Sequence, residues 1–281
     1  MEDIENLEKE LSEKTKLVAM LAPSFVVNFS YPEIIDQLKR LGFDKVVELT
    51  FGAKMVNLEY NKLIKKTRKL LISTVCPGVV DTVQREFPQC KKNLIPVYSP
   101  MVATALVSKK VYPKHKTVFI SPCNFNKTEA KTSPKKCIDF VIDYVELQKL
   151  LDKYNIKPKK SRRKITFDLF YNDYTKLYPT SGGLFKTAHL EGLLKEDESK
   201  IAASIVDTRE FLKNPDKKIK FLDATFCVGS CVGGPFLTKD LTLKQKKEKV
   251  LKYVRRGLRE SMPLDKKGIK KKAKGIVFSY C

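Results

Sequence analysis

Four cysteines constrain this chain most, because each follows an apolar run or lies in a turn rich in glycine and proline. The segments are Ser73-Thr74-Val75-Cys76-Pro77-Gly78, Ser121-Pro122-Cys123, and Cys227-Val228-Gly229-Ser230-Cys231 with Gly233-Gly234-Pro235 behind it. Short turns of this kind let backbone N–H groups approach a bound group closely. We therefore expect the chemistry of the protein to lie on these loops.

The first half of the chain alternates between apolar runs and amphipathic segments. Residues 17–27 predict a buried strand that ends in a Pro turn, residues 31–41 a helix capped by Gly42, residues 45–50 a strand, and residues 52–67 a helix. Strand followed by helix, repeated in this way, is the rhythm of an α/β fold.

The same alternation of strands and helices places the cysteines just after predicted strands. Strands at 70–74 and 117–121 run into Cys76 and Cys123, and helix 79–87 follows the first of them. The later elements are predicted as helix 144–153, strand 165–170, a helix start at 181–183, strand 202–206 and strand 219–225, which leads to Cys227. Ligands of open α/β sheets bind beyond the carboxyl ends of strands, and the thiols fall there.

The length of the chain and the number of its cysteines limit which class of protein it can be. A chain of 281 residues with 42% hydrophobic content can bury a substantial core as one large domain or two lobes. Seven cysteines is an odd number, and residues 1–16 form a charged pattern rather than a secretory leader, so we expect reduced thiols in the cytoplasm. No apolar run reaches the ~20 residues of a membrane span.

The net charge of +23 would suit an acidic partner, an anionic membrane surface or nucleic acid. The excess lies mainly at residues 157–164 and 244–274, without an arginine-rich helix or interleaved aromatic residues. A solvated Lys-rich surface is the simpler interpretation, and nucleic acid is not an expected partner.

Residue chemistry alone leaves three interpretations of the four cysteines open. An iron–sulfur cluster is favoured because every thiol lies in a shaped loop at a strand end. A tetrahedral zinc site, in a nucleic-acid-binding protein for example, would usually use two local cysteine pairs, whereas this chain has one such pair. Unrelated buried cysteines are the third interpretation.

The order and spacing of several motifs are similar to the hydrogen-activating domain of iron-only ([FeFe]) hydrogenases. The motifs are Thr74-Val75-Cys76-Pro77-Gly78, Tyr98-Ser99-Pro100-Met101, Ser121-Pro122-Cys123 with Lys127 and Glu129, Ser181-Gly182-Gly183, and Cys227 to Cys231 with Gly233-Gly234. Ala22-Pro23-Ser24 and residues 41–47 match as well. The resemblance covers roughly residues 17–240.

The resemblance implies a cofactor and a set of residues. Cys76, Cys123, Cys227 and Cys231 would bind a [4Fe-4S] cluster, and Cys231 would bridge to a diiron subsite carrying CO, cyanide and a dithiolate. Residues that would contact the cofactor are Ala22, Pro23, Ser24, Pro100, Met101, Gly182 and Gly183. Ser99, Lys127 and Glu59 would take part in catalysis, with Glu59 as an acidic relay.

Departures from the family pattern bear on activity. Catalytic members carry a proton-relaying cysteine before the first ligand, and the position here is Val75. A lysine that donates to a cyanide is replaced by Asn126, a methionine over the diiron subsite by Ser121, and a serine of the proton path by Ile95. Loss of a positioned acid–base group costs ~10²–10⁴-fold in rate, so we expect slow turnover.

The resemblance implies a fold of two lobes, each a mainly parallel twisted sheet flanked by helices, with the cluster between the lobes at strand ends. We expect a charged helix at 1–16, lobes of roughly 17–135 and 136–240, and a basic helix and tail at 241–281. The Gly233-Gly234-Pro235 tail and the segment around Ser99 resemble a sensory branch of the family.

The implied function is reversible proton reduction and H2 oxidation by a ferredoxin-linked oxidoreductase of hydrogen metabolism. The alternative is a non-catalytic H2 or redox sensor, or an Fe–S carrier, on the same scaffold. The chain has no C-x2-C-x2-C-x3-C run, so it would depend on an external electron carrier such as an acidic ferredoxin, and on hydrogenase maturation proteins for the diiron subsite.

Overall fold

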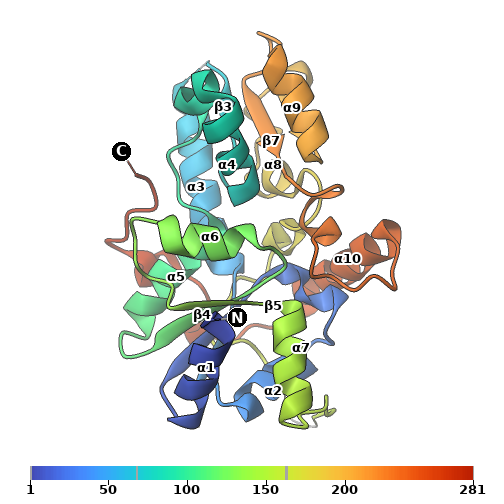
Figure 1. Cartoon of the computed structure of the whole chain (residues 1–281). Coiled ribbons are helices and arrows are strands. Elements are labelled where there is room, and N and C mark those ends of the chain that lie inside the picture. The colour runs from blue at the N-terminus through green and yellow to red at the C-terminus, as the bar shows by residue number, and fades with distance from the viewer. Residues whose placement is uncertain (1, 68, 162–163, 281) are drawn as a thin grey trace.

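The computed structural model describes residues 2–67, 69–161 and 164–280 as two parallel sheets flanked by helices (Figure 1). The first sheet has the strand order β2-β1-β4-β5, with β1 (Leu17–Leu21), β2 (Lys45–Glu48), β4 (Lys116–Ser121) and β5 (Phe140–Asp143). The second has the order β3-β7-β6, with β3 (Leu71–Ile72), β6 (Ser199–Ala202) and β7 (Phe221–Ala224). The predicted α/β fold is therefore confirmed.

Helices surround both sheets. The α-helices are α1 (Glu2–Ser12), α2 (Glu33–Leu41), α3 (Thr50–Lys66), α4 (Pro77–Glu86), α5 (Pro100–Val111), α6 (Phe125–Thr132), α7 (Tyr144–Lys153), α8 (Gly183–Thr187), α9 (Ile205–Lys213) and α10 (Leu243–Arg259). Short 3-10 helices are η1 (Pro23–Val27), η2 (Pro88–Asn93), η3 (Tyr174–Leu177), η4 (Glu196–Glu198), η5 (Ser230–Gly233), η6 (Leu264–Lys266) and η7 (Lys270–Ala273). Figure 1 shows α6 lying between the two lobes.

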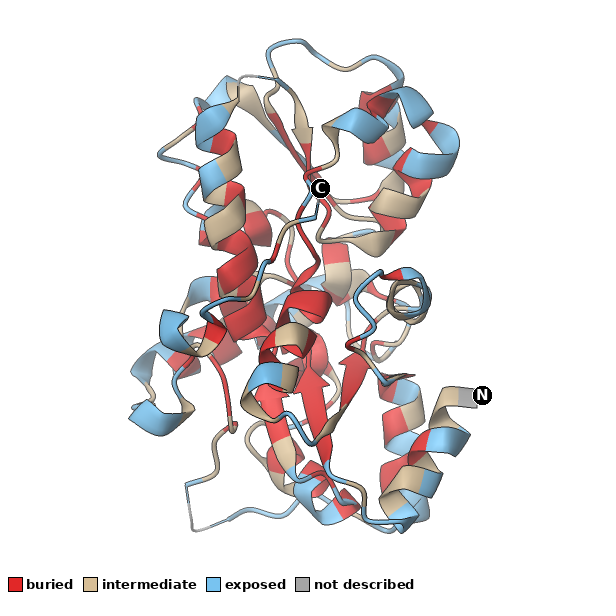
Figure 2. Cartoon of the chain, turned by 90° about the vertical axis from the view of Figure 1, so that its left-hand side faces the viewer, coloured by how far each residue is buried: buried red, intermediate tan, exposed pale blue. Residues whose placement is uncertain are grey.

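The first sheet is buried on both faces, as parallel sheets usually are. Along β1, Val18 and Met20 pack into one core cluster, whereas Leu17, Ala19 and Leu21 pack into another on the opposite face. This alternation follows from the two-residue period of a strand. Figure 2 shows the buried residues along the strands and on the inward sides of the helices.

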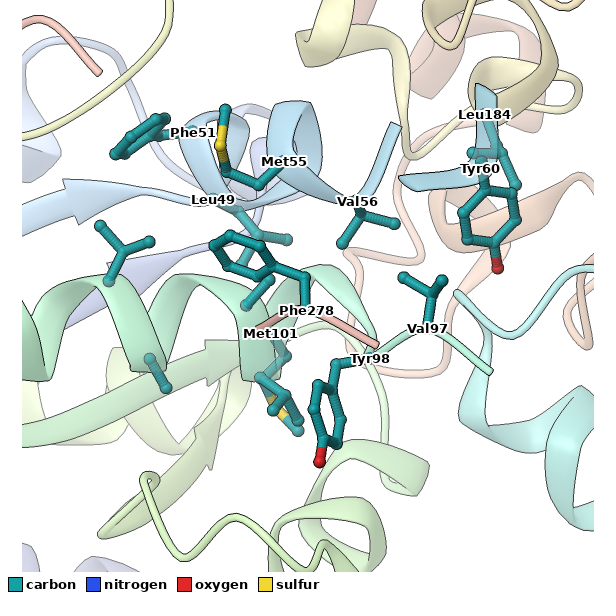
Figure 3. Close-up of a cluster of buried hydrophobic side chains, with 14 of the residues drawn as sticks. Leu49, Phe51, Met55, Val56, Tyr60, Val97, Tyr98, Met101, Leu184 and Phe278 are labelled. Carbon is teal, nitrogen blue, oxygen red and sulfur yellow. The ribbon is translucent and has the colours of Figure 1, made fainter. Parts of the chain in front are cut away.

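The first of these clusters extends from the sheet toward the second lobe. It joins Leu49 before α3, Met101 on α5 and Phe278 near the C-terminus (Figure 3). Tyr60 at the far end of the cluster packs edge-on against Phe221 of the second sheet, with ring centroids 6.2 Å apart. A continuous apolar core therefore connects the lobes beside the segments that carry the cysteines.

Several predicted elements differ from the structure. Residues 165–170 make isolated bridges through Leu169 and Phe170 rather than the predicted strand. The predicted strand at 202–206 is displaced, because β6 ends at Ala202 and the Ser204 hydroxyl caps α9. Strand β5 was not predicted as a separate element.

Sheet membership does not follow the predicted boundary near residue 135. Strand β3 precedes that boundary yet pairs with β7 in the second sheet, and β5 follows it yet pairs with β4 in the first. The reason is the long-range pairing of strand ends, which local patterns do not encode. Residues 162–163 of the basic stretch at 157–164 lie outside the described residues.

Candidate metal centre

Each of the four cysteines lies at the end of a strand or in the turn behind it. Cys76 follows β3 and occupies the N-cap position of α4, and Cys123 follows β4. Cys227 follows β7, and Cys231 lies one turn further on in η5. All four are free thiols that are partly exposed.

These thiols line one cavity between the sheets. Its volume is about 90 Å³. The remaining wall comes from the η1 turn, the start of α5, and the segment before Ser181. Strand ends of both sheets therefore converge on one point, although the cysteines are far apart in the sequence.

Close backbone contacts hold the cysteine loops together. The Phe125 ring beside Cys123 packs on the Phe226 ring beside Cys227, with centroids 4.7 Å apart. A Cβ on Gly78 would lie 2.9 Å from Phe125, and a Cβ on Gly234 would lie 2.9 Å from the Pro122 carbonyl oxygen. Glycine is therefore required where the loops of Cys76 and Cys231 meet their neighbours.

The environment of the thiols combines burial with backbone donors. Burial, together with nearby thiols, raises the pKa of Cys227 to about 11 and that of Cys123 to about 12. Burial also raises the pKa of Cys231, to which the three other cysteines contribute. The Phe226 N–H donates to the Cys76 sulfur at 3.4 Å. Thiolates crowded in this way would be stabilised by a cationic group that binds all of them.

The cysteines are not arranged around a single ion. Within residues 2–67, 69–161 and 164–280, no group of three or more His, Cys, Asp or Glu side chains is positioned to hold one metal ion. Zinc would need all its sulfur ligands within about 2.3 Å of one point. A cubane offers one iron to each thiolate and so suits ligands that surround a larger space.

Most of the other predicted site residues reach the cavity. Ala22, Pro23 and Ser24 line it from η1, and Ser99, Pro100 and Met101 line it from the start of α5. The Ser24 hydroxyl is buried and lies 2.7 Å from the Tyr144 hydroxyl, so its orientation is fixed.

Four predicted site residues do not line the cavity. Glu59 pairs with Lys62 on the outer face of α3, at 2.7 Å. The Lys127 ammonium turns away to Glu146, at 2.7 Å, because α6 directs it toward the start of α7. Gly182 and Gly183 form the turn that begins α8, behind the wall rather than on its surface.

The departures from the family pattern fall on or behind the cavity wall. Val75 and Asn126 line the cavity, and Ile95 is fully buried in the apolar core. The buried Ser121 hydroxyl donates to the Asn126 side-chain oxygen at 2.8 Å. The wall at Val75 therefore presents an apolar side chain where the family carries a thiol.

Sequence reasoning missed part of the wall. Leu49, Phe119, Tyr178 and Pro179 also line the cavity. The Pro179 carbonyl accepts from the Val232 N–H at 3.0 Å and so ties this wall to the Cys231 turn. The only local signal was a Tyr-Pro step just before Ser181, which is too common to mark a site.

Comparison with known proteins gives the family. A profile described as iron only hydrogenase large subunit, C-terminal domain, matches residues 15–235. The chain therefore belongs to this family. Iron hydrogenase 1 of Clostridium pasteurianum is 29% identical over 137 residues, which are 42% of this chain and 24% of that protein. The match thus spans about a quarter of that relative's length.

Solved structures show the same fold. One that reports stepwise assembly of the [FeFe]-hydrogenase H-cluster superposes with a TM-score of 0.68 at 16% identity, covering 95% of this chain and 90% of that one. A variant of an [FeFe]-hydrogenase from Chlamydomonas reinhardtii gives 0.67 at the same identity and coverage. Among the described residues, no helix is both long and apolar enough to cross a bilayer.

Proposed function

We propose that this chain is an iron–sulfur protein in which Cys76, Cys123, Cys227 and Cys231 hold a [4Fe-4S] cluster. One observation carries this proposal: the four thiols, delivered by strands of two different sheets, line a single cavity. The close contacts at Gly78 and Gly234 support it, because they keep the loops at a fixed separation.

The proposed activity is a slow, reversible interconversion of protons and H2. When bound beside Cys231, a diiron subsite with CO, cyanide and dithiolate ligands would supply this chemistry. The η1 turn and the start of α5 would shield it from solvent with Pro23, Pro100 and Met101. Val75 and Ile95 can neither donate nor accept a proton, so they support a low rate.

An external acidic carrier such as a ferredoxin is the proposed electron partner. Leu243 at the start of α10 packs against the Cys227–Cys231 turn, since a Cβ on Gly229 would lie 2.5 Å from its side chain. Leu243 is 41% exposed and Val228, within the turn, 69% exposed. Exposed Lys239, Lys244 and Lys247 flank them, and a basic surface with an apolar centre suits an acidic carrier.

Maturation with the hydrogenase-assembly proteins, in the cytoplasm of a host grown without oxygen, tests the proposal. We expect CO and CN stretches in the infrared spectrum, together with H2 evolution from dithionite-reduced viologen. Iron and labile sulfide should be present in near-equal amounts before maturation, as a cubane requires. Zinc without labile sulfide would contradict the whole proposal, whereas iron and sulfide without CO and CN bands would contradict only the diiron part.

The second candidate function is a redox sensor or Fe–S carrier without a diiron subsite. One observation favours it: the Lys127 ammonium faces Glu146 instead of the cavity. Failure of Val75→Cys protein to acquire CO and CN bands, with its cubane intact, would support this candidate.

A further inference from the structure

A second cavity adjoins the one that the cysteines line. Its volume is about 450 Å³, and α4, α6, the segment before α5 and the C-terminal segment enclose it. Exposed Gln84, Thr128 and Thr132 form its rim, so water can enter. Ser99 lines both cavities, and so does Pro77, which carries no group able to transfer a proton.

Glu129 lies in the wall of this second cavity. Asn126 lines the cysteine cavity, and its side-chain N–H donates a hydrogen bond to the Glu129 carboxylate at 3.4 Å. Ser99 lines the second cavity together with Glu129, and its hydroxyl lowers the pKa of that carboxyl group. Ser99 and Asn126, which also line the cysteine cavity, are therefore the groups that face Glu129 from the cysteine side.

The environment of Glu129 suits exchange of a proton near neutral pH. Burial raises the pKa of Glu129 to about 7, and the polar side chains of Ser99 and Asn126 oppose this rise. Tyr280 lines the same cavity, and the Glu129 charge raises the pKa of Tyr280, Cys137 and Cys76. Asp81 and Tyr98 line the same cavity, and Arg85 pairs with Asp81 on α4.

We propose that Glu129 and Ser99 form a proton relay between the second cavity, which is open to water, and the cysteine cavity. The inference rests on the proposed function and supplies a route where Val75 and Ile95 block the family's usual one. The Glu129 carboxyl takes a proton from water and passes it to the Ser99 oxygen. Ser99 releases its own hydroxyl proton to an acceptor in the cysteine cavity, so each group ends unchanged.

The first test uses the protein before maturation. Infrared difference spectra between about pH 5 and pH 9 should show a protonated carboxyl band that titrates near pH 7. Glu129→Gln should abolish the component near pH 7 and leave the one that Asp223 contributes near pH 6. Ser99→Ala should move the Glu129 midpoint upward, because a polar group that favours the carboxylate is lost. Glu86→Gln, which removes an exposed carboxylate paired with Arg209, serves as the control and should leave the band unchanged.

The second test uses matured protein. Glu129→Gln should lower H2 evolution by ~10²–10⁴-fold and remove its dependence on a group titrating near pH 7, with unchanged CO and CN bands. Glu129→Asp, with a shortened carboxyl group, should recover part of the rate. Glu59→Gln removes the relay suggested by the sequence and should have no effect on the pH profile.

Two results would overturn the relay: a band near pH 7 that persists in Glu129→Gln protein, or a wild-type rate and pH profile in matured Glu129→Gln protein. A loss of rate in Glu59→Gln but not in Glu129→Gln would overturn it as well. Missing CO and CN bands in matured wild-type protein would instead contradict the diiron proposal, and the carboxyl titration of unmatured protein would still decide the protonation of Glu129.

Discussion

Replacing Lys176 with Met tests how the fold supports the cysteine cavity. The Lys176 side chain is 2% exposed and forms an ion pair with Glu48, which is fully buried at the end of β2. The Tyr253 hydroxyl of α10 donates to Glu48 and accepts from Lys176 at 3.0 Å. The Thr50 hydroxyl donates to Glu48 at 2.9 Å. This network joins η3, β2 and α10 directly behind Leu49, Tyr178 and Pro179 of the cavity wall.

The expected cost follows from the partners that each substitution leaves behind. Removing one member of a buried ion pair costs about 3–5 kcal/mol, because the other charge remains without compensation. Lys176→Met leaves Glu48 with two hydroxyl donors, so we expect about 3 kcal/mol. Glu48→Gln leaves the Lys176 ammonium with a neutral amide, the Tyr253 hydroxyl and the Tyr253 ring, 4.4 Å away, so we expect up to about 5 kcal/mol.

Urea unfolding followed by circular dichroism would measure both costs. The double variant has no buried charge at this site, and Tyr253 and Thr50 can still donate to the amide oxygen that replaces the Glu48 carboxylate. We therefore expect it to lose no more than about 2 kcal/mol. Lys62→Met is the control, because Lys62 is 63% exposed in its pair with Glu59 and should cost less than about 1 kcal/mol. A Lys176→Met cost as small as that control, or a double-variant cost equal to the sum of the single ones, would refute the reasoning.

Three further predictions concern the site and its pH dependence. Replacing any one of the four cysteines with Ala should lower the iron and labile sulfide content measured after anaerobic reconstitution, whereas Cys90→Ala, outside the cavity, should not. Val75→Cys should raise H2 evolution in matured protein, because it places a thiol on the cavity wall; an unchanged rate with intact CO and CN bands would contradict a limiting role for Val75. Burial raises the pKa of Asp223 to about 6, so the folded state binds its proton more tightly than the unfolded chain does. The contribution of Asp223 to the free energy of unfolding should therefore fall as the pH rises from about 4 through about 6. In Asp223→Asn protein, the urea midpoint should depend less on pH over this range.

The sequence predicted the ends of β4 and β7 well, because both are apolar runs whose burial fixes their type. It also placed the cysteines at those ends. The predicted strand at 17–27 was too long, since β1 ends at Leu21 and residues 23–27 form η1 behind Pro23. The sequence did not predict the partners of the strands: β3 is only two residues long, and its pairing with β7 depends on residues about 150 positions away. The orientation of Lys127 could not be predicted either, since it depends on Glu146, which the packing of α6 beside β5 and α7 brings close.

The surfaces through which electrons and protons would reach the cysteines are formed by different parts of the chain. The exposed turn at Val228 and the basic start of α10 form one of them, and the cavity at Glu129 lies between α4, α6 and the C-terminal segment. Figure 1 shows α10 and the C-terminus on opposite sides of the molecule. Attraction of an acidic carrier to α10 is screened by salt, whereas interactions among the half-buried groups at Glu129 are screened less. Substitution of Lys244 should therefore change how the rate of reduction by the carrier depends on salt, and it should leave the pH profile of H2 evolution unchanged. Substitution of Glu129 should change that pH profile and leave the salt dependence unchanged.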